Sequence, residues 1–185
     1  TAEEFIFRAS GGNKSIRDES AVIRRIKGNT LVWNQRLANP NFADGTLRWF
    51  GNNGSLAVNA NGSVRFTHTY SGSQSVMQTF TERIPSGHKV LVVMDYQRGD
   101  NTAISSLVYL QRSSNGFDRF SFPRIGSNAR RVEACIITTT DEISTIMAYP
   151  FLNAPVGAYS DIYSINVFDL TQMYGAGNEP SGVSE

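Results

Sequence analysis

Residues 88–97 read His-Lys-Val-Leu-Val-Val-Met-Asp-Tyr-Gln, a run that is typical of a β-strand with one fully buried face. Successive side chains of a strand point to opposite faces, so the run divides into two rows. One row is wholly apolar and is expected to face a core between two sheets: Val90, Val92, Met94 and Tyr96. The other row is expected to face outward and becomes polar towards its end: Leu91, Val93, Asp95 and Gln97.

Similar β-rich runs recur along the chain between clusters of Gly, Asn, Pro and Ser. Asn61-Gly62 is a strong hairpin signal because both residues tolerate a positive φ, and Lys27-Gly28-Asn29 indicates a second hairpin. In the run around residues 104–112, Val108 and Leu110 are expected to point inward. Because no long helix separates these runs, the sequence predicts an all-β fold of antiparallel sheets packed as a β-sandwich.

The sandwich is expected to span residues 22–172. Residues 1–21 are expected to be a segment or linker from a preceding region, and residues 173–185 a C-terminal linker. Thr1-Ala-Glu-Glu4 has the form of a capping box, which predicts a short helix through about Arg8.

Composition excludes several classes of protein. The formal net charge is +1, whereas a nucleic-acid-binding domain normally carries a clustered basic excess. The apolar run at Val90–Met94 is far shorter than the ~20 residues that span a bilayer. A single cysteine, Cys135, excludes an internal disulfide framework and a cysteine-based zinc site. We therefore expect no nucleic-acid partner and no membrane insertion.

Enzyme signatures are weak, so we expect a protein that is not an enzyme. His68 and His88 lack metal-ligand spacing, and Cys135 lies in a strand-like apolar run. A glycosidase needs two carboxylates facing each other across a cleft, and Asp95 and Glu133 are the pair on predicted strands that could do so.

Carbohydrate binding fits the residues better, because sugars are bound by aromatic platforms together with planar polar side chains. If the strands at 88–97 and 104–112 are adjacent, they present one outward patch near a preceding loop. The candidate ligand-binding residues are Trp49, Asp95, Gln97, Tyr109 and Gln111. The alternative interpretation is an ordinary polar outer face that carries one exposed tyrosine.

Asn39-Pro-Asn-Phe-Ala-Asp-Gly-Thr-Leu-Arg-Trp49 resembles the opening of galactose-binding-like, jelly-roll carbohydrate-binding modules. The resemblance implies that the all-β fold is an antiparallel jelly-roll β-sandwich. In the related pattern an acidic residue follows the Phe and often helps to hold a structural calcium. Ala43 occupies that position here, which argues against a calcium site at Asn41, Asp44 and Asp169. No cofactor is therefore expected.

The segments 26–35 and 167–180 resemble the start and the end of a module common in phage and prophage structural proteins of gut bacteria. Thr1–Phe5 matches the usual continuation of that module, so the chain is expected to be a piece of a longer tail or fibre protein. The resemblance implies a virion or extracellular location and partners that include bacterial surface glycan and other segments of the same fibre. Two alternatives stay open, a structural fibre spacer and an accessory binding module of a secreted bacterial glycanase.

Overall fold

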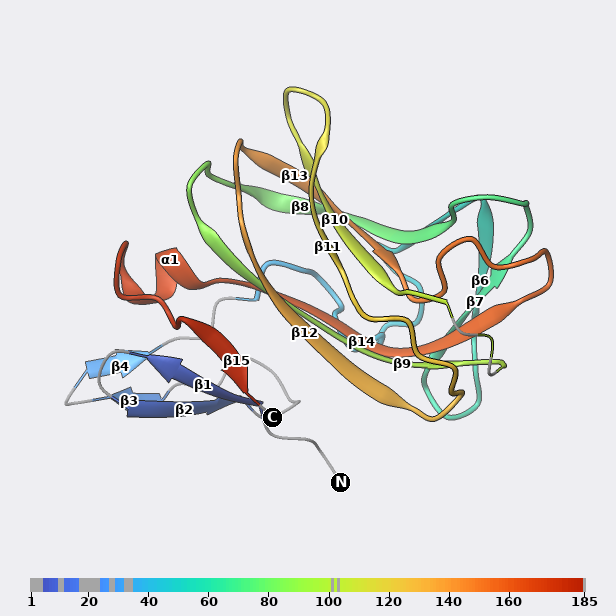
Figure 1. Cartoon of the computed structure of the whole chain (residues 1–185), viewed down its shortest axis with the longest axis horizontal. Coiled ribbons are helices and arrows are strands. Elements are labelled where there is room, and N and C mark those ends of the chain that lie inside the picture. The colour runs from blue at the N-terminus through green and yellow to red at the C-terminus, as the bar shows by residue number, and fades with distance from the viewer. Residues whose placement is uncertain are drawn as a thin grey trace.

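Two five-stranded antiparallel sheets face each other across an apolar core in the computed structural model (Figure 1). The structure describes residues 35–100, 102 and 104–183, together with the backbone at 5–9, 12–16, 24–26, 29–31 and 184. Sheet I has the strand order β11-β10-β13-β8-β5, and sheet II has the order β12-β9-β14-β7-β6. The predicted all-β jelly-roll sandwich is confirmed.

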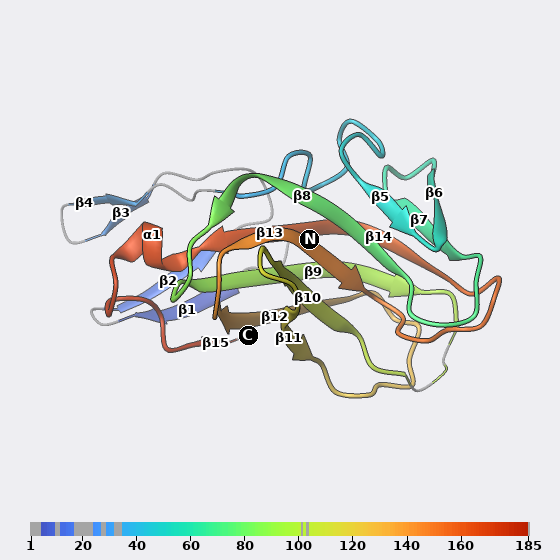
Figure 2. The same cartoon turned by 90° about the horizontal axis from the view of Figure 1, so that it is seen from above.

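The strands of sheet I are β5 (Phe50–Asn52), β8 (Ser75–Ile84), β10 (Leu107–Arg112), β11 (Phe117–Ser121) and β13 (Ile143–Tyr149). Those of sheet II are β6 (Gly54–Val58), β7 (Val64–His68), β9 (Lys89–Arg98), β12 (Arg131–Thr138) and β14 (Tyr159–Asp169). β6 and β7 pair with Val58 opposite Val64, which confirms the hairpin around Asn61-Gly62. Figure 2 shows these two strands and β5 at the end of the sandwich that is remote from the helix α1.

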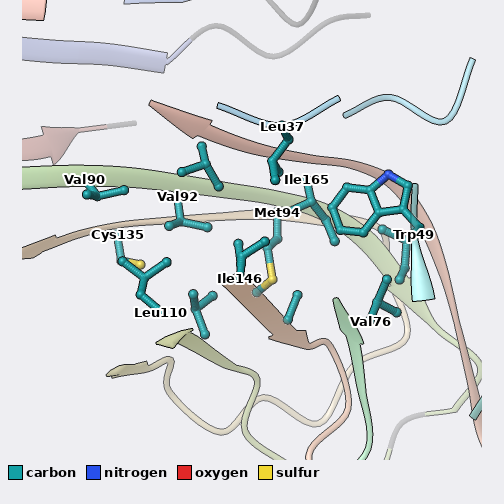
Figure 3. Packing of buried hydrophobic residues seen from close by; sticks show 14 of the residues in the cluster. Leu37, Trp49, Val76, Val90, Val92, Met94, Leu110, Cys135, Ile146 and Ile165 are labelled. Atoms are coloured by element: carbon teal, nitrogen blue, oxygen red, sulfur yellow. The ribbon is translucent and has the colours of Figure 1, made fainter. Parts of the chain in front are cut away.

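The core between the sheets contains the predicted inward rows of β9 and β10, each residue at most 1% exposed: Val90, Val92, Met94, Tyr96, Val108 and Leu110. Figure 3 shows several of them packed with Ile146 and Cys135 from other strands. Fully burying one such aliphatic side chain contributes about 1.5–3 kcal/mol to folding. The alternation argument is therefore confirmed for both strands.

The outward row of β9 is covered over its apolar half. Leu91 and Val93 are buried in a second cluster with Phe168 and Leu170, against which Val183 packs. The short helix α1 (Leu170–Tyr174) was not predicted; Asp169 caps it by accepting a hydrogen bond from Gln172 N over 3.0 Å. Asp95 and Gln97, the polar end of this outward row, lie outside the cluster.

Strands from both ends of the chain form a separate small sheet. β1 (Phe5–Ala9) pairs with β2 (Gly12–Ile16) and with β15 (Gly182–Ser184). The predicted helix through Arg8 is wrong. β1 is hydrogen-bonded to a neighbouring strand on both edges, whereas an isolated helix of about two turns is only marginally stable in water. The capping box at residues 1–4 lies outside the described residues. β3 (Arg24–Ile26) and β4 (Asn29–Leu31) form the second predicted hairpin.

Across the described parts of the chain, no helix has the length and apolar character needed to cross a membrane.

Candidate functional site

The outer face of sheet I carries an aromatic and apolar surface. Tyr109 projects from β10 opposite Met147 of β13, which in turn lies opposite Met77 of β8. The same row continues to Phe50 of β5, whose residue is 62% exposed, and in the other direction to Arg119 of β11. A line of large side chains thus crosses all five strands.

Tyr109 and Phe117 are the aromatic pair at one end of this face. Their rings are stacked, with centroids 4.8 Å apart and an interplanar angle of 22°. Phe117 is 41% exposed, and Tyr109 is half-buried because it also meets the Tyr149 ring edge-on at 5.2 Å. Diagonal neighbours on adjacent strands are within reach of aromatic side chains, which explains the stack. The pair leaves ring surface open to a ligand.

Polar side chains border the stacked rings. Gln111 lies directly opposite Phe117 on one side and Thr145 on the other, and Arg119 lies opposite Tyr109. The next strand adds Thr79, whose hydroxyl is 3.4 Å from that of Thr145. Amide, guanidinium and hydroxyl groups therefore surround an apolar platform.

The β10–β11 hairpin that carries Phe117 is held in place by buried Asp118. Its carboxylate accepts hydrogen bonds from Arg112 Nη2 over 2.7 Å and from Thr140 N over 2.8 Å. Burial by itself would raise the pKa of Asp118, but these hydrogen bonds outweigh it and lower the pKa below its ordinary value. A carboxylate that stays charged thus fixes the hairpin against the loop after β12.

Asp95 and Gln97 lie on a different surface, the outer face of sheet II. The expected single patch with Tyr109 and Gln111 is wrong, since β9 pairs with β12 and β14 and not with β10. Sequence alternation correctly placed all four side chains on outer faces, but the two strands belong to opposite sheets. Tyr109 and Gln111 are brought together; Asp95 and Gln97 are brought together elsewhere.

Trp49 does not border either surface. It is 4% exposed and packs in the core near Leu37 and Ile165 (Figure 3). Its Nε1 donates to the carbonyl oxygen of Asn39 over 2.8 Å, and its ring lies 5.2 Å from that of Phe42. The segment 39–49 therefore folds so that Trp49 lies in the core. The expected role of Trp49 in ligand binding is corrected accordingly.

Asp95 and Glu133, the carboxylates considered for glycosidase chemistry, are separated. Asp95 points outward from β9, whereas Glu133 on β12 lies opposite Met94, in the row that faces the core. Glu133 Oε2 accepts hydrogen bonds from Tyr96 over 2.9 Å and from Ser106. Because the two carboxylates point to opposite faces of sheet II, they cannot share a substrate.

The other reactive side chains have structural surroundings. His68 is 1% exposed, with its ring 5.2 Å from Phe66 and 6.0 Å from Phe151. Burial raises the pKa of Cys135 to about 12, which leaves an unreactive thiol. His88 Nδ1 lies 2.9 Å from Oδ2 of buried Asp169.

Two of the three residues considered for calcium have side chains that are engaged in other interactions. Asp169 interacts with His88 and Arg36 beside α1, while Asn41 Oδ1 accepts a hydrogen bond from Ala43 N over 3.4 Å. Within the described residues, no group of three or more His, Cys, Asp or Glu side chains is placed to hold a metal ion.

Two aromatic residues in these surfaces were missed by the sequence analysis. Phe117 and Phe120 lie in opposite alternating rows of β11, so alternation could not show which of the two faces outward. Tyr163 lies at a β-bulge between Ile162 and Ser164, which interrupts the alternation of β14. The usable signal was the spacing of Phe117 from Arg119. The two residues are two positions apart, so alternation puts both side chains on the same face of the strand.

No protein-family model matches the sequence, and no curated protein matches it either. Solved structures share its fold. The CBM22-1 xylan-binding domain of Paenibacillus barcinonensis Xyn10C is 9% identical, with a TM-score of 0.56 over 74% of this chain and 95% of that chain. A CBM4 module is 11% identical, with a TM-score of 0.50 over 69% of this chain and 99% of that chain.

The enzymatically active domain of tailspike protein 4 from bacteriophage CBA120 is also similar, at 10% identity and a TM-score of 0.51. The match covers 73% of this chain but only 21% of the tailspike chain. At such identities the likeness shows the fold alone, which is that of the carbohydrate-binding modules.

Proposed function

We propose that this chain is a non-catalytic glycan-binding domain that binds its ligand on the outer face of sheet I. The observation that carries the proposal is the stacked Tyr109–Phe117 pair, which lies on that face beside Gln111 and Arg119. An aromatic ring gains contact area on the apolar face of a pyranose, and neighbouring polar groups orient its hydroxyls through hydrogen bonds. The jelly-roll fold, shared with carbohydrate-binding modules, supports the same function.

The proposed setting is a phage or prophage tail or fibre protein that attaches to bacterial surface glycan, on the virion or outside the cell. The resemblance of 26–35 and 167–180 to a phage structural module supports it, as does the likeness to a tailspike domain. A shallow site of this kind binds weakly, and several copies on one fibre would supply avidity. The likeness to a xylan-binding domain favours the alternative, an accessory module of a secreted glycanase.

The test is retention of the purified chain on arrays of bacterial surface polysaccharides and plant polysaccharides. Phe117→Ala is expected to weaken retention by at least about tenfold, equivalent to about 1.4 kcal/mol. Phe120→Ala is a matched control, because Phe120 is similarly exposed, at 38%, but lies on the other face of the same strand.

Retention on bacterial glycans alone would support the phage setting, and retention on plant polysaccharides alone would support the glycanase module. Equal binding by Phe117→Ala and the unmodified chain would exclude the site. No retention on any glycan would favour the structural spacer.

A further inference from the structure

A pocket of about 450 Å³ lies on the opposite side of the sandwich, beside the polar end of sheet II. Its volume is within the range of roughly 300–1,000 Å³ that is usual for small-molecule sites. The lining comes from the loop 41–45, the end of β6, the turn at 61–63, and side chains next to Asp95 and Gln97. The lining residues are Asn41, Phe42, Ala43, Gly45, Val58, Asn61, Gly62, Ser63, Arg130, Tyr163 and Ser164.

One wall of the pocket is a preorganised cation–aromatic unit. The guanidinium carbon of Arg130 lies 3.7 Å from the centre of the Tyr163 ring. Arg130 Nε also donates to Oδ1 of Asp95 over 2.8 Å, and its Nη2 to Oδ2. The Tyr163 hydroxyl donates to Gln97 over 3.3 Å. Asp95 and Gln97 therefore hold two flat side chains in a fixed orientation.

Two exposed amides form the opposite wall. Asn61 Oδ1 accepts hydrogen bonds from Ser63 N over 3.1 Å and from the Ser63 hydroxyl over 2.7 Å. Asn41 Oδ1 is engaged in the same way by Ala43 N. Among the described residues neither Asn has an acceptor for its Nδ2, so this wall offers amide N–H donors to a ligand. Val58, at 57% exposed, adds an apolar contact between them.

Two guanidinium groups at or near the pocket are each paired with a carboxylate. Arg130 is balanced by Asp95, and the neighbouring Arg65 is balanced by Asp161 through two hydrogen bonds of 2.8 and 2.9 Å. An anion would gain little from these paired guanidinium groups, whereas a neutral ring with several hydroxyls could use the amide donors and the apolar contact.

We propose that this pocket is a second ligand site that binds one neutral pyranose unit. The inference extends the proposed function, because two sites on opposite faces would let one domain hold two glycan chains. It does not depend on the sheet I site, since no residue is shared between the two surfaces.

The test is an NMR titration of the ¹⁵N-labelled chain with D-glucose, D-galactose, D-mannose and D-xylose at millimolar concentrations. At least one sugar is expected to shift the backbone amides of Gly45, Gly62 and Ser63 in a saturable way. The double variant Asn41→Asp, Asn61→Asp keeps both turn-forming oxygens but removes both amide donors. It is expected to weaken the apparent affinity at least about tenfold.

Asn115→Asp is the matched control, because it makes the same change in an exposed turn on the β10–β11 hairpin and should leave the titration unchanged. Phe117→Ala should also leave these shifts unchanged, so failure of the sheet I site is distinguishable from failure of the pocket. Three results would each overturn the inference. They are loss of the shifts in Phe117→Ala, full binding by the double variant, and the absence of a saturable shift with any of the four sugars.

Discussion

Arg36 Nη2 donates to Oδ2 of Asp169 over 3.1 Å, although 133 positions separate the two residues. The Asp169 side chain is completely buried, and it also meets His88 and caps α1. The Asp169 carboxylate thus contacts Arg36 in the segment before the loop 39–49, His88 directly before β9, and the first turn of α1, the helix that covers sheet II.

Asp169→Asn is expected to lower the free energy of unfolding by roughly 3–5 kcal/mol, because it removes the buried anionic partner of Arg36 and leaves only Glu82, whose side chain is exposed. Urea unfolding would measure the change. Asp44→Asn makes the same replacement at an exposed loop position and should change stability by less than about 0.5 kcal/mol. Similar small effects at both positions would contradict the prediction.

Val92→Ala is expected to cost roughly 1–3 kcal/mol through lost burial and a cavity between the sheets. Val58→Ala is the natural comparison, because Val58 is 57% exposed whereas Val92 is fully buried. Thermal and urea unfolding of the two variants should therefore differ clearly. Equal midpoints would mean that β9 does not face the core as described.

Burial of His68 makes the free energy of unfolding depend on pH. Burial lowers the pKa of His68, and within the described structure neither ring nitrogen has a hydrogen-bond partner. Below about pH 6.5 the unfolded chain gains a proton that the folded chain resists, so the free energy of unfolding falls as the pH drops. The slope from this one group is at most about 1.4 kcal/mol per pH unit.

His68→Leu should remove this contribution while leaving His88 in place. The measurement is urea unfolding of both proteins at several pH values between about 7 and 5, compared as a difference. Parallel pH profiles would show that His68 titrates alike in the folded and unfolded chains, against the prediction.

The strands and the direction of their side chains were predictable because alternation is a local property. The inward rows of β9 and β10 followed from nothing more than their sequence. The assignment of strands to sheets was not predictable, since it depends on long-range pairing. β9 takes β12 and β14 as neighbours, so side chains that seemed adjacent, such as Gln97 and Tyr109, lie on opposite faces of the sandwich.

Trp49 illustrates a different limit. An aromatic residue at the end of a polar loop has the same sequence context whether it faces a ligand or the core. Its hydrogen bond to the Asn39 carbonyl is what allows the indole to be buried, and that bond exists only once the loop is folded.

The two roles of Tyr109 can be separated by two substitutions. Tyr109→Ala removes the contacts with Tyr149 and Phe117, so we expect a loss of roughly 1–3 kcal/mol in stability together with loss of glycan binding. Tyr109→Phe keeps the ring in both contacts and removes only the hydroxyl. If stacking on the ring dominates binding, Tyr109→Phe should keep near-normal stability and bind the glycan within a few-fold of the unmodified chain.

Array retention and thermal unfolding, measured on the same preparations, check both properties. Binding by Tyr109→Ala in its folded state would exclude the ring as a platform, while equal loss of binding in both variants would place the interaction at the hydroxyl.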